Sequence, residues 1–175
     1  MINTPNALHS LITLSIYKIG THLSQENDQQ TLQVRSISRR CLLYIQSFGD
    51  ASTQTELVNA NYARVLVIAI STASGHGKEQ DSEIWYGFNS ISDFLNNLNQ
   101  GRIDDCQPSF PHQPLLVRRS VEQFEEEGGN EEIEAQMSNV GYFIGYNIKS
   151  NANQAKGRIL NYFIEQGNPR PDWYN

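Results

Sequence analysis

The chain has 175 residues, a net charge of −6 at pH 7 and only 18% charged residues. This length is typical of one domain, which we expect to span residues 1–175. No run of about 18 apolar residues is present, so we expect no membrane-spanning helix. The first residues also lack the basic flank and apolar run of a secretion signal, which favours a cytoplasmic protein. Two cysteines, Cys41 and Cys106, are too few for a disulfide framework.

Apolar residues at three- and four-residue steps predict helices along most of the chain. The first helix is expected to begin at Pro5, with Thr4 as its cap. A second is expected over residues 29–48, ending at Gly49 in a left-handed conformation. Its expected core-facing stripe, which includes a buried Cys41, consists of Val34, Ile37, Cys41, Ile45 and Phe48.

The stretch "RVLVIAISTASGHGKE", residues 64–79, fits either a buried strand before a glycine loop or a buried helix. A buried parallel strand would need partner strands, and no similar run of β-branched residues exists. We therefore predict a central buried helix over residues 57–73. In the glycine loop, Glu79 follows Lys78 where a phosphate-binding loop needs a hydroxyl, so the loop is interpreted as a turn.

The remainder of the chain also predicts helices. One should begin at Asp81 or Ser82 and end at Gly101, followed by a proline-stiffened loop near 102–116. Further helices are expected at about 117–127, 131–148 and 153–166, with an extended tail over 167–175. The predicted fold class is all-α, a single helical bundle of about six helices.

One loop gathers residues with chemical potential. A thiol, an imidazole and two carboxylates lie within nine positions and could form a nucleophile site or a weak metal site: Asp104, Asp105, Cys106 and His112. A surface loop with an Asp pair as cap explains them more simply. No metal-binding helix motif accompanies them. We therefore predict no catalytic residue, no metal, no cofactor and no enzymatic activity.

Two charged clusters are candidate binding surfaces. Arg35, Arg39 and Arg40 lie on the expected outer face of the second helix and could contact phosphates, or form a solvated face. An acidic run follows Arg119, and its seven glutamates in thirteen positions either form a solvated face or steer a basic partner. The residues of that run that we predict to contact a partner are Glu122, Glu125, Glu126 and Glu127.

A glycine-containing aromatic segment is the last candidate. Tyr142, Phe143 and Tyr146 flank Gly141 and Gly145, whose missing side chains would allow another backbone to approach closely. Together, these features predict a non-enzymatic helical protein that binds another protein or copies of itself: an adaptor, an inhibitor or immunity-type protein, or an assembly subunit. The alternative is a structural nucleic-acid packaging or RNA-binding protein, such as a coat-type subunit.

Overall fold

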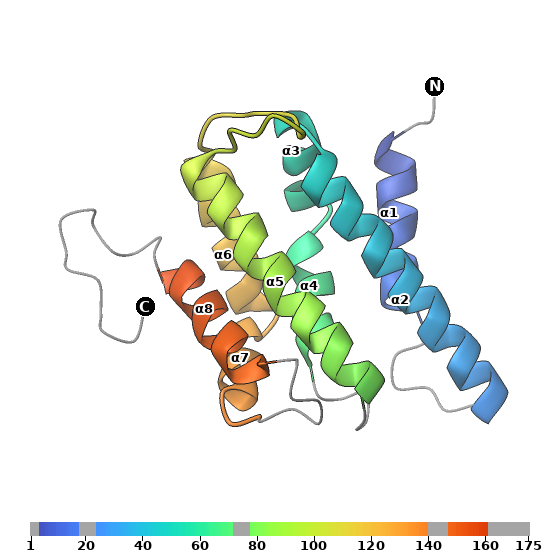
Figure 1. The fold of residues 1–175 in the computed structure, drawn as a ribbon. Coiled ribbons are helices and arrows are strands. Elements are labelled where there is room, and N and C mark those ends of the chain that lie inside the picture. The colour runs from blue at the N-terminus through green and yellow to red at the C-terminus, as the bar shows by residue number, and fades with distance from the viewer. Residues whose placement is uncertain (1–3, 18–23, 72–77, 140–146, 161–175) are drawn as a thin grey trace.

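The computed structural model describes residues 4–17, 24–71, 78–139 and 147–160. Within these ranges it contains eight α-helices and no strand, which confirms the all-α bundle (Figure 1). The helices are α1 (Thr4–Ser15), α2 (Gln25–Phe48), α3 (Ala51–Asn59), α4 (Tyr62–Ile70), α5 (Lys78–Gln100), α6 (Pro114–Glu126), α7 (Gly129–Gln136) and α8 (Ile148–Leu160). The expected count of about six was too low.

Local sequence explains where most of these helices begin and end. Ser24 caps α2 by accepting a hydrogen bond from the Asn27 backbone, and Asp50 caps α3 by accepting from that of Thr53. Pro114 opens α6 at its first turn. Gly101 has a φ of +78°, a left-handed conformation that ends α5 as predicted. Gly49 ends α2 in an extended conformation instead, so the prediction of a left-handed residue there was wrong.

The predicted third helix is divided in two. Between α3 and α4, Asn61 has a φ of 59° and a ψ of 52°, a left-handed conformation that helices do not continue through. The side-chain amide of Asn61 donates to the Glu127 carboxylate at 2.9 Å, which helps to hold this corner against the end of α6. The predicted break after the fifth helix is confirmed, because Gly128 has a φ of +73° between α6 and α7.

The predicted boundaries near the C-terminus need correction. A helix was expected to continue to residue 148 and another to begin near 153, whereas α7 ends at Gln136 and α8 begins at Ile148. The proline loop ends at residue 113, and α6 begins at Pro114. Within the loop, an antiparallel bridge joins Arg102 to Phe110. The expected tail over 167–175 lies outside the described residues.

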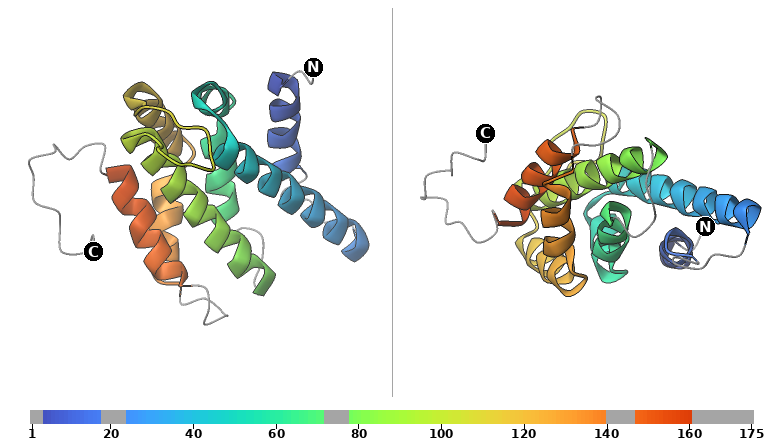
Figure 2. Two further views of the ribbon diagram at one scale, coloured as in Figure 1. Left: turned by 45° about the horizontal axis from the view of Figure 1, so that its top comes forward. Right: turned by 90° about the horizontal axis from the view of Figure 1, so that it is seen from below.

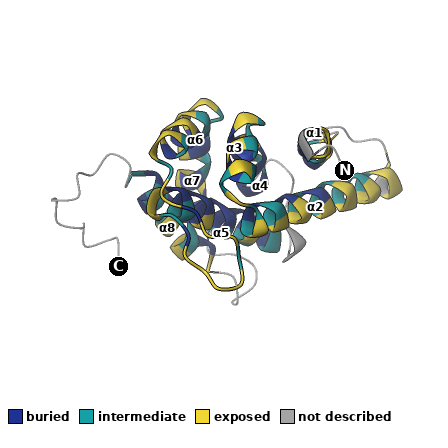
Figure 3. Ribbon diagram, turned by 90° about the horizontal axis from the view of Figure 1, so that it is seen from above, coloured by how far each residue is buried: buried dark blue, intermediate teal, exposed yellow. Residues whose placement is uncertain are grey.

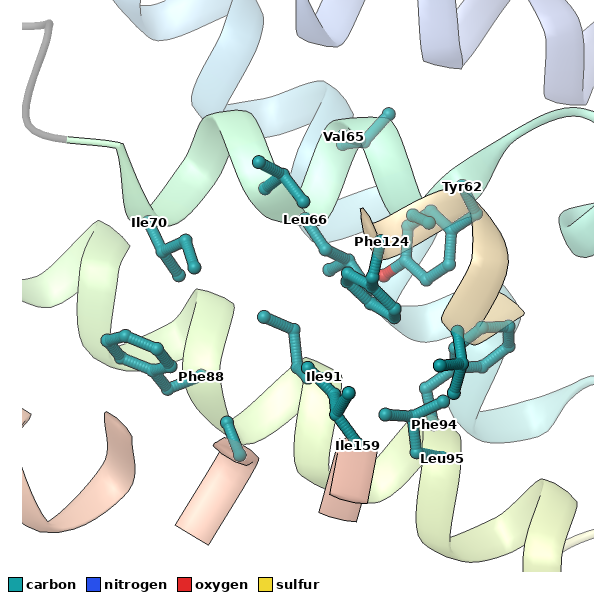
Figure 4. Close-up of a cluster of buried hydrophobic side chains, with 14 of the residues drawn as sticks. Tyr62, Val65, Leu66, Ile70, Phe88, Ile91, Phe94, Leu95, Phe124 and Ile159 are labelled. Carbon is teal, nitrogen blue, oxygen red and sulfur yellow. The ribbon is translucent and has the colours of Figure 1, made fainter. Parts of the chain in front are cut away.

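The core is organised around α4. Its residues from Tyr62 to Ile70 are buried except for Arg64 and the half-buried Ile68, and it contacts α1, α3, α5, α6 and α7. Figure 4 shows Leu66 and Ile70 facing Phe88 and Ile91 of α5, with Phe124 of α6 beside them. Of the helix predicted over 57–73, residues 57–59 and 62–70 are helical, and α4 is central in the fold.

The two flanks of α5 are covered differently (Figure 2). On one side α8 lies along α5, burying Ile148, Ala152, Ala155 and Ile159. On the other side α2 diverges from α5 and packs mainly against α1. Because α2 is covered on fewer sides than α5, a large part of its surface faces solvent (Figure 3).

Candidate interaction surface

The outer face of α2 is apolar. Five residues, which we call the α2 ridge, are exposed along it: Val34, Ile37, Cys41, Tyr44 and Phe48. The exposed fractions of Val34, Ile37, Tyr44 and Phe48 are 39%, 60%, 61% and 55%. The rings of Tyr44 and Phe48 stack with centroids 6.3 Å apart. Successive helical residues turn by about 100°, so the centre of the ridge lies about 120° around α2 from the buried Leu42.

This arrangement corrects the predicted orientation of α2. Four of the five residues assigned to its core-facing stripe are exposed, including Cys41, and only Ile45 packs against the core. The buried positions are instead Ser38, Leu42 and Gln46. Burial of polar residues and exposure of apolar residues on one helix both require a physical explanation.

Hydrogen bonds explain the buried face. The Gln46 side chain donates to the Ser90 carbonyl at 3.2 Å and accepts from the Tyr62 hydroxyl at 2.9 Å. The Gln54 amide donates to the Gln46 carbonyl at 2.8 Å. Burial raises the pKa of Tyr62, so its hydroxyl stays protonated as a donor at neutral pH. This network joins α2 to α3, α4 and α5, and it fixes the side of α2 that faces the core.

The C-terminus of α2 is held by Arg102 from the proline loop. Its guanidinium donates to the carbonyls of Ser47 (2.6 Å), Gly49 and Pro108 (2.9 Å), and lies 4.7 Å from the centre of the Phe110 ring. A cation at the end of a helix satisfies carbonyls that have no partner within it. Arg102 therefore fixes the position of the C-terminal turn, which carries Phe48 of the ridge.

A groove runs beside the ridge, between α2 and α5, with α4 as its floor. Its volume is about 540 Å³. Tyr44 and Phe48 line one wall, Trp85 and Tyr86 line the other, and Leu66 lies on the floor. Tyr86 is 49% exposed, and its ring meets that of Trp85 edge to face. The groove therefore combines aromatic side chains, which continue the apolar surface of the ridge, with charged ones, including Arg39, Glu83 and Asp93.

The predicted arginine cluster lies next to this groove, but two of its members have intramolecular partners. Arg39 forms an ion pair with Glu83 at 3.3 Å, and Ser36 donates to the same carboxylate. Burial lowers the pKa of Arg39, and the attraction of Glu83 partly offsets that effect. Arg35 donates to the Tyr17 carbonyl at 3.2 Å. Arg40 is exposed at the rim of the groove.

The predicted acidic run occupies the end of α6 and most of α7, away from the ridge (Figure 1). Glu125 and Glu126 are exposed, and Glu122 pairs with Arg118 at 2.9 Å on the same helix. Glu127 is half-buried. Its carboxylate accepts a hydrogen bond from the Asn61 amide and lies 3.6 Å from Nε of Arg64. Glu127 therefore helps to hold helices together within the fold, whereas Glu125 and Glu126 form a solvated acidic surface.

The other segments predicted as candidate sites give little support for a binding or catalytic site. Tyr142, Phe143 and Tyr146 lie outside the described residues, as does most of the glycine loop. In the proline loop, Asp104 accepts from the Cys106 backbone at 2.7 Å, a local turn contact, and its neighbours Asp105 and His112 are exposed. In the part of the chain that the structure describes, no three His, Cys, Asp or Glu side chains are grouped to hold a metal ion.

No family model, curated protein or solved structure shows significant similarity to this chain. None of the described helices combines the length and the apolar character that crossing a membrane requires.

Sequence reasoning missed the ridge, although its signal was present. The spacing of 34, 37, 41, 44 and 48 alternates three and four residues, which is the pattern of a seam between two helices. The same pattern also fits a core-facing stripe, so the sequence alone could not decide which face of α2 would be covered.

Proposed function

We propose that this protein acts, without catalysis, by binding another protein through the α2 ridge and the adjoining groove. The observation that carries the proposal is the apolar ridge on the solvent-exposed face of α2. Contiguous exposed apolar surface is typical of interaction sites, and tyrosine and other aromatic residues are enriched where binding energy is concentrated. Ile37, Tyr44 and Phe48 are each more than half exposed.

The shape of the surface favours a helical segment as its ligand. A groove between two helices that presents aromatic side chains on both walls is suited to the apolar face of an amphipathic helix. Tyr44 and Phe48 belong to both the ridge and the groove, so one bound helix could contact both.

The exposed glutamates and the two free cysteines also bear on the function. The exposed Glu125 and Glu126 lie on another face than the ridge, where they would steer a second, basic partner. Cys41 and Cys106 are both exposed and unbridged, which agrees with the reducing conditions of a cytoplasmic location. The alternative of nucleic-acid binding has less support, since Arg35 and Arg39 already have partners in the fold.

A photo-crosslinking amino acid at position 37 tests the proposal, with the same substitution at position 103 as control. Ile37 and Ile103 are both exposed isoleucines, at 60% and 99%, but Ile103 lies in the proline loop. In an extract of the cells that make the protein, we expect a discrete adduct only from position 37. Unlabelled protein should compete for that adduct, whereas the Ile37→Glu variant should not.

Equal adducts from both positions would contradict the proposal, because they would indicate random collision. A second result would also contradict the proposal: the Ile37→Glu variant competes for the adduct at position 37 as effectively as the wild type does. Binding would then not depend on the ridge.

A further inference from the structure

The spacing of the α2 ridge indicates which kind of surface would cover it. Steps of three, four, three and four residues place its five side chains in one narrow row along about two heptads. Such a row fits a second helix that crosses at a small angle, with each side chain entering the spaces between those of the other helix. A flat or sheet-like surface would not need this repeat.

We infer that the helix covering the ridge is α2 of a second copy of this chain, so that the protein forms a dimer. This inference rests on the proposed function, and it names the partner of the same surface. A two-fold interface brings the same patch of both copies together, so the patch must match itself. An uncharged apolar row at heptad spacing meets this condition, because each copy supplies the same alternation of side chains and gaps.

The charges around the ridge are compatible with two copies meeting there. From residue 29 to residue 48, α2 contains no acidic residue and three arginines. Arg39 is neutralised by Glu83, and Arg35 donates to the carbonyl of Tyr17, in the turn that follows α1. Arg40 lies toward the groove rather than within the ridge. Two ridges can therefore approach each other without placing a charged side chain between them.

The area of the ridge is sufficient for a weak dimer. An aromatic side chain buries about 150–250 Å² when fully covered, so Tyr44 and Phe48, which are 61% and 55% exposed, each offer on the order of 100 Å². With the rest of the ridge and Tyr86, each copy supplies roughly 400–500 Å² from side chains alone. Stable interfaces bury about 800 Å² per partner, so we expect a weak dimer with a dissociation constant in the micromolar range.

Other exposed apolar side chains do not form a comparable row. In the ranges that the structure describes, the other large exposed hydrophobic residues are dispersed over α1, α5, α6 and the proline loop: Leu14, Tyr17, Tyr86, Ile103 and Leu115. Single apolar residues of this kind are normal on protein surfaces. The ridge is therefore the described surface best suited to pair with α2 of another copy.

The position of Cys41 provides a direct geometric test. Cys41 is the middle residue of the ridge, and its thiol is exposed. In a parallel pair, identical residues face each other, and in an antiparallel pair centred on the ridge its middle residues do so. Either pairing brings Cys41 opposite its equivalent in the second copy. Cys106, in the proline loop, is an equally exposed thiol that should not meet its equivalent.

The experiment has two arms. In the first, sedimentation equilibrium of the full chain measures self-association up to about 200 μM, well above the expected dissociation constant. We expect a monomer–dimer equilibrium in the wild type. The Ile37→Glu substitution should raise the dissociation constant at least about tenfold, because it places a charge in the centre of an apolar interface. The matched Ile103→Glu variant should behave as the wild type.

In the second arm, diamide oxidises pairs of thiols to disulfides and is itself reduced to the hydrazine. The Cys106→Ser variant, which keeps only Cys41, should form a covalent dimer rapidly. The Cys41→Ser variant, which keeps only Cys106, should do so at least about tenfold more slowly, since a disulfide needs Cα atoms within about 7 Å.

A wild type that stays monomeric would overturn the inference, as would equal effects of the two glutamate variants or equal oxidation of the two cysteine variants. The proposed function would survive such a result if position 37 still formed its competed photo-adduct with another protein. Loss of that adduct as well would contradict both the dimer and the proposed function.

Discussion

Arg102 is the side chain that fixes the end of the ridge-bearing helix. It comes from the proline loop and donates to carbonyls at the C-terminus of α2 and to Pro108 of its own loop. Burial lowers the pKa of its guanidinium and the nearby Asp104 partly offsets this, so that it remains charged at neutral pH. Because one residue satisfies several carbonyls, its removal should leave several polar groups without partners.

The Arg102→Ala substitution should therefore lower the free energy of unfolding by about 2–4 kcal/mol. The matched change is Arg118→Ala, which removes an exposed arginine in an i, i+4 pair with Glu122. It should cost less than about 0.5 kcal/mol, because exposed ion pairs contribute little. Urea unfolding followed by circular dichroism measures both variants. Equal effects would show that Arg102 does not hold the loop on α2.

Asn61 is the residue that divides α3 from α4. Its left-handed conformation costs about 1–2 kcal/mol for most residues, less for asparagine and nothing for glycine. Asn61→Ala should destabilise more than Asn61→Gly by about 1 kcal/mol, although both lose the hydrogen bond to Glu127. Thermal or urea unfolding of the pair checks this. If the alanine variant were the more stable one, Asn61 would not be left-handed, and α3 and α4 would form the single helix first predicted.

At the scale of the element, sequence predicted the presence of helices better than their ends and faces. The apolar run of α4 was correctly identified as a helix, because no partner strands exist in the sequence. The break before it was missed, since no glycine or proline marks it and apolar residues continue on both sides. Asparagine can adopt the left-handed conformation, but its presence in a sequence does not require it.

The orientation of α2 could not be read from its pattern for a different reason. Periodicity analysis places the apolar face inward, whereas the inward face of α2 contains Ser38 and Gln46. Their burial depends on partners in α4 and α5 that are distant in sequence, such as Tyr62 and Ser90. A polar residue whose partner lies in another helix has the same local pattern as one that faces solvent.

The packing of α4 gives a prediction at this scale. Leu66 is 3% exposed, and Leu66→Ala should destabilise the protein by about 2–5 kcal/mol through the cavity left beside α5. Leu115→Ala removes the same atoms from a side chain that is 80% exposed, and it should cost less than about 0.5 kcal/mol. Chemical denaturation compares the two. A small effect at Leu66 would place α4 outside the core.

For the whole molecule, the distribution of charge predicts its behaviour toward polyanions. The net charge is −6, and two of the three arginines of α2 have partners in the fold. We expect no retention on a heparin column at about 100 mM salt, because the one exposed arginine of α2 does not overcome the long-range repulsion from the net negative charge. Retention that is lost in the Arg40→Glu variant would contradict this expectation and would favour the nucleic-acid alternative.

The candidate site was predictable only in part at this scale. Composition and the lack of catalytic motifs favoured protein contacts, and the predicted surfaces were the glutamates and the aromatic segment, with the α2 arginines as possible phosphate contacts. The structure places the ridge on a third surface, because α1 covers only one side of α2 while α5 diverges from the other. That divergence depends on how several helices pack together, which no local pattern contains.

The central claim is that α2 turns its apolar ridge toward solvent. The most direct test is the free energy of unfolding of Ile37→Glu beside that of Leu42→Glu, at about 1 μM protein, where little dimer should form. Ile37 is 60% exposed and Leu42 is fully buried. We predict a change within about 0.5 kcal/mol for Ile37→Glu and loss of the folded state for Leu42→Glu, which buries an unpaired charge. A loss of several kcal/mol in Ile37→Glu would show that the ridge is part of the core, and would contradict the account.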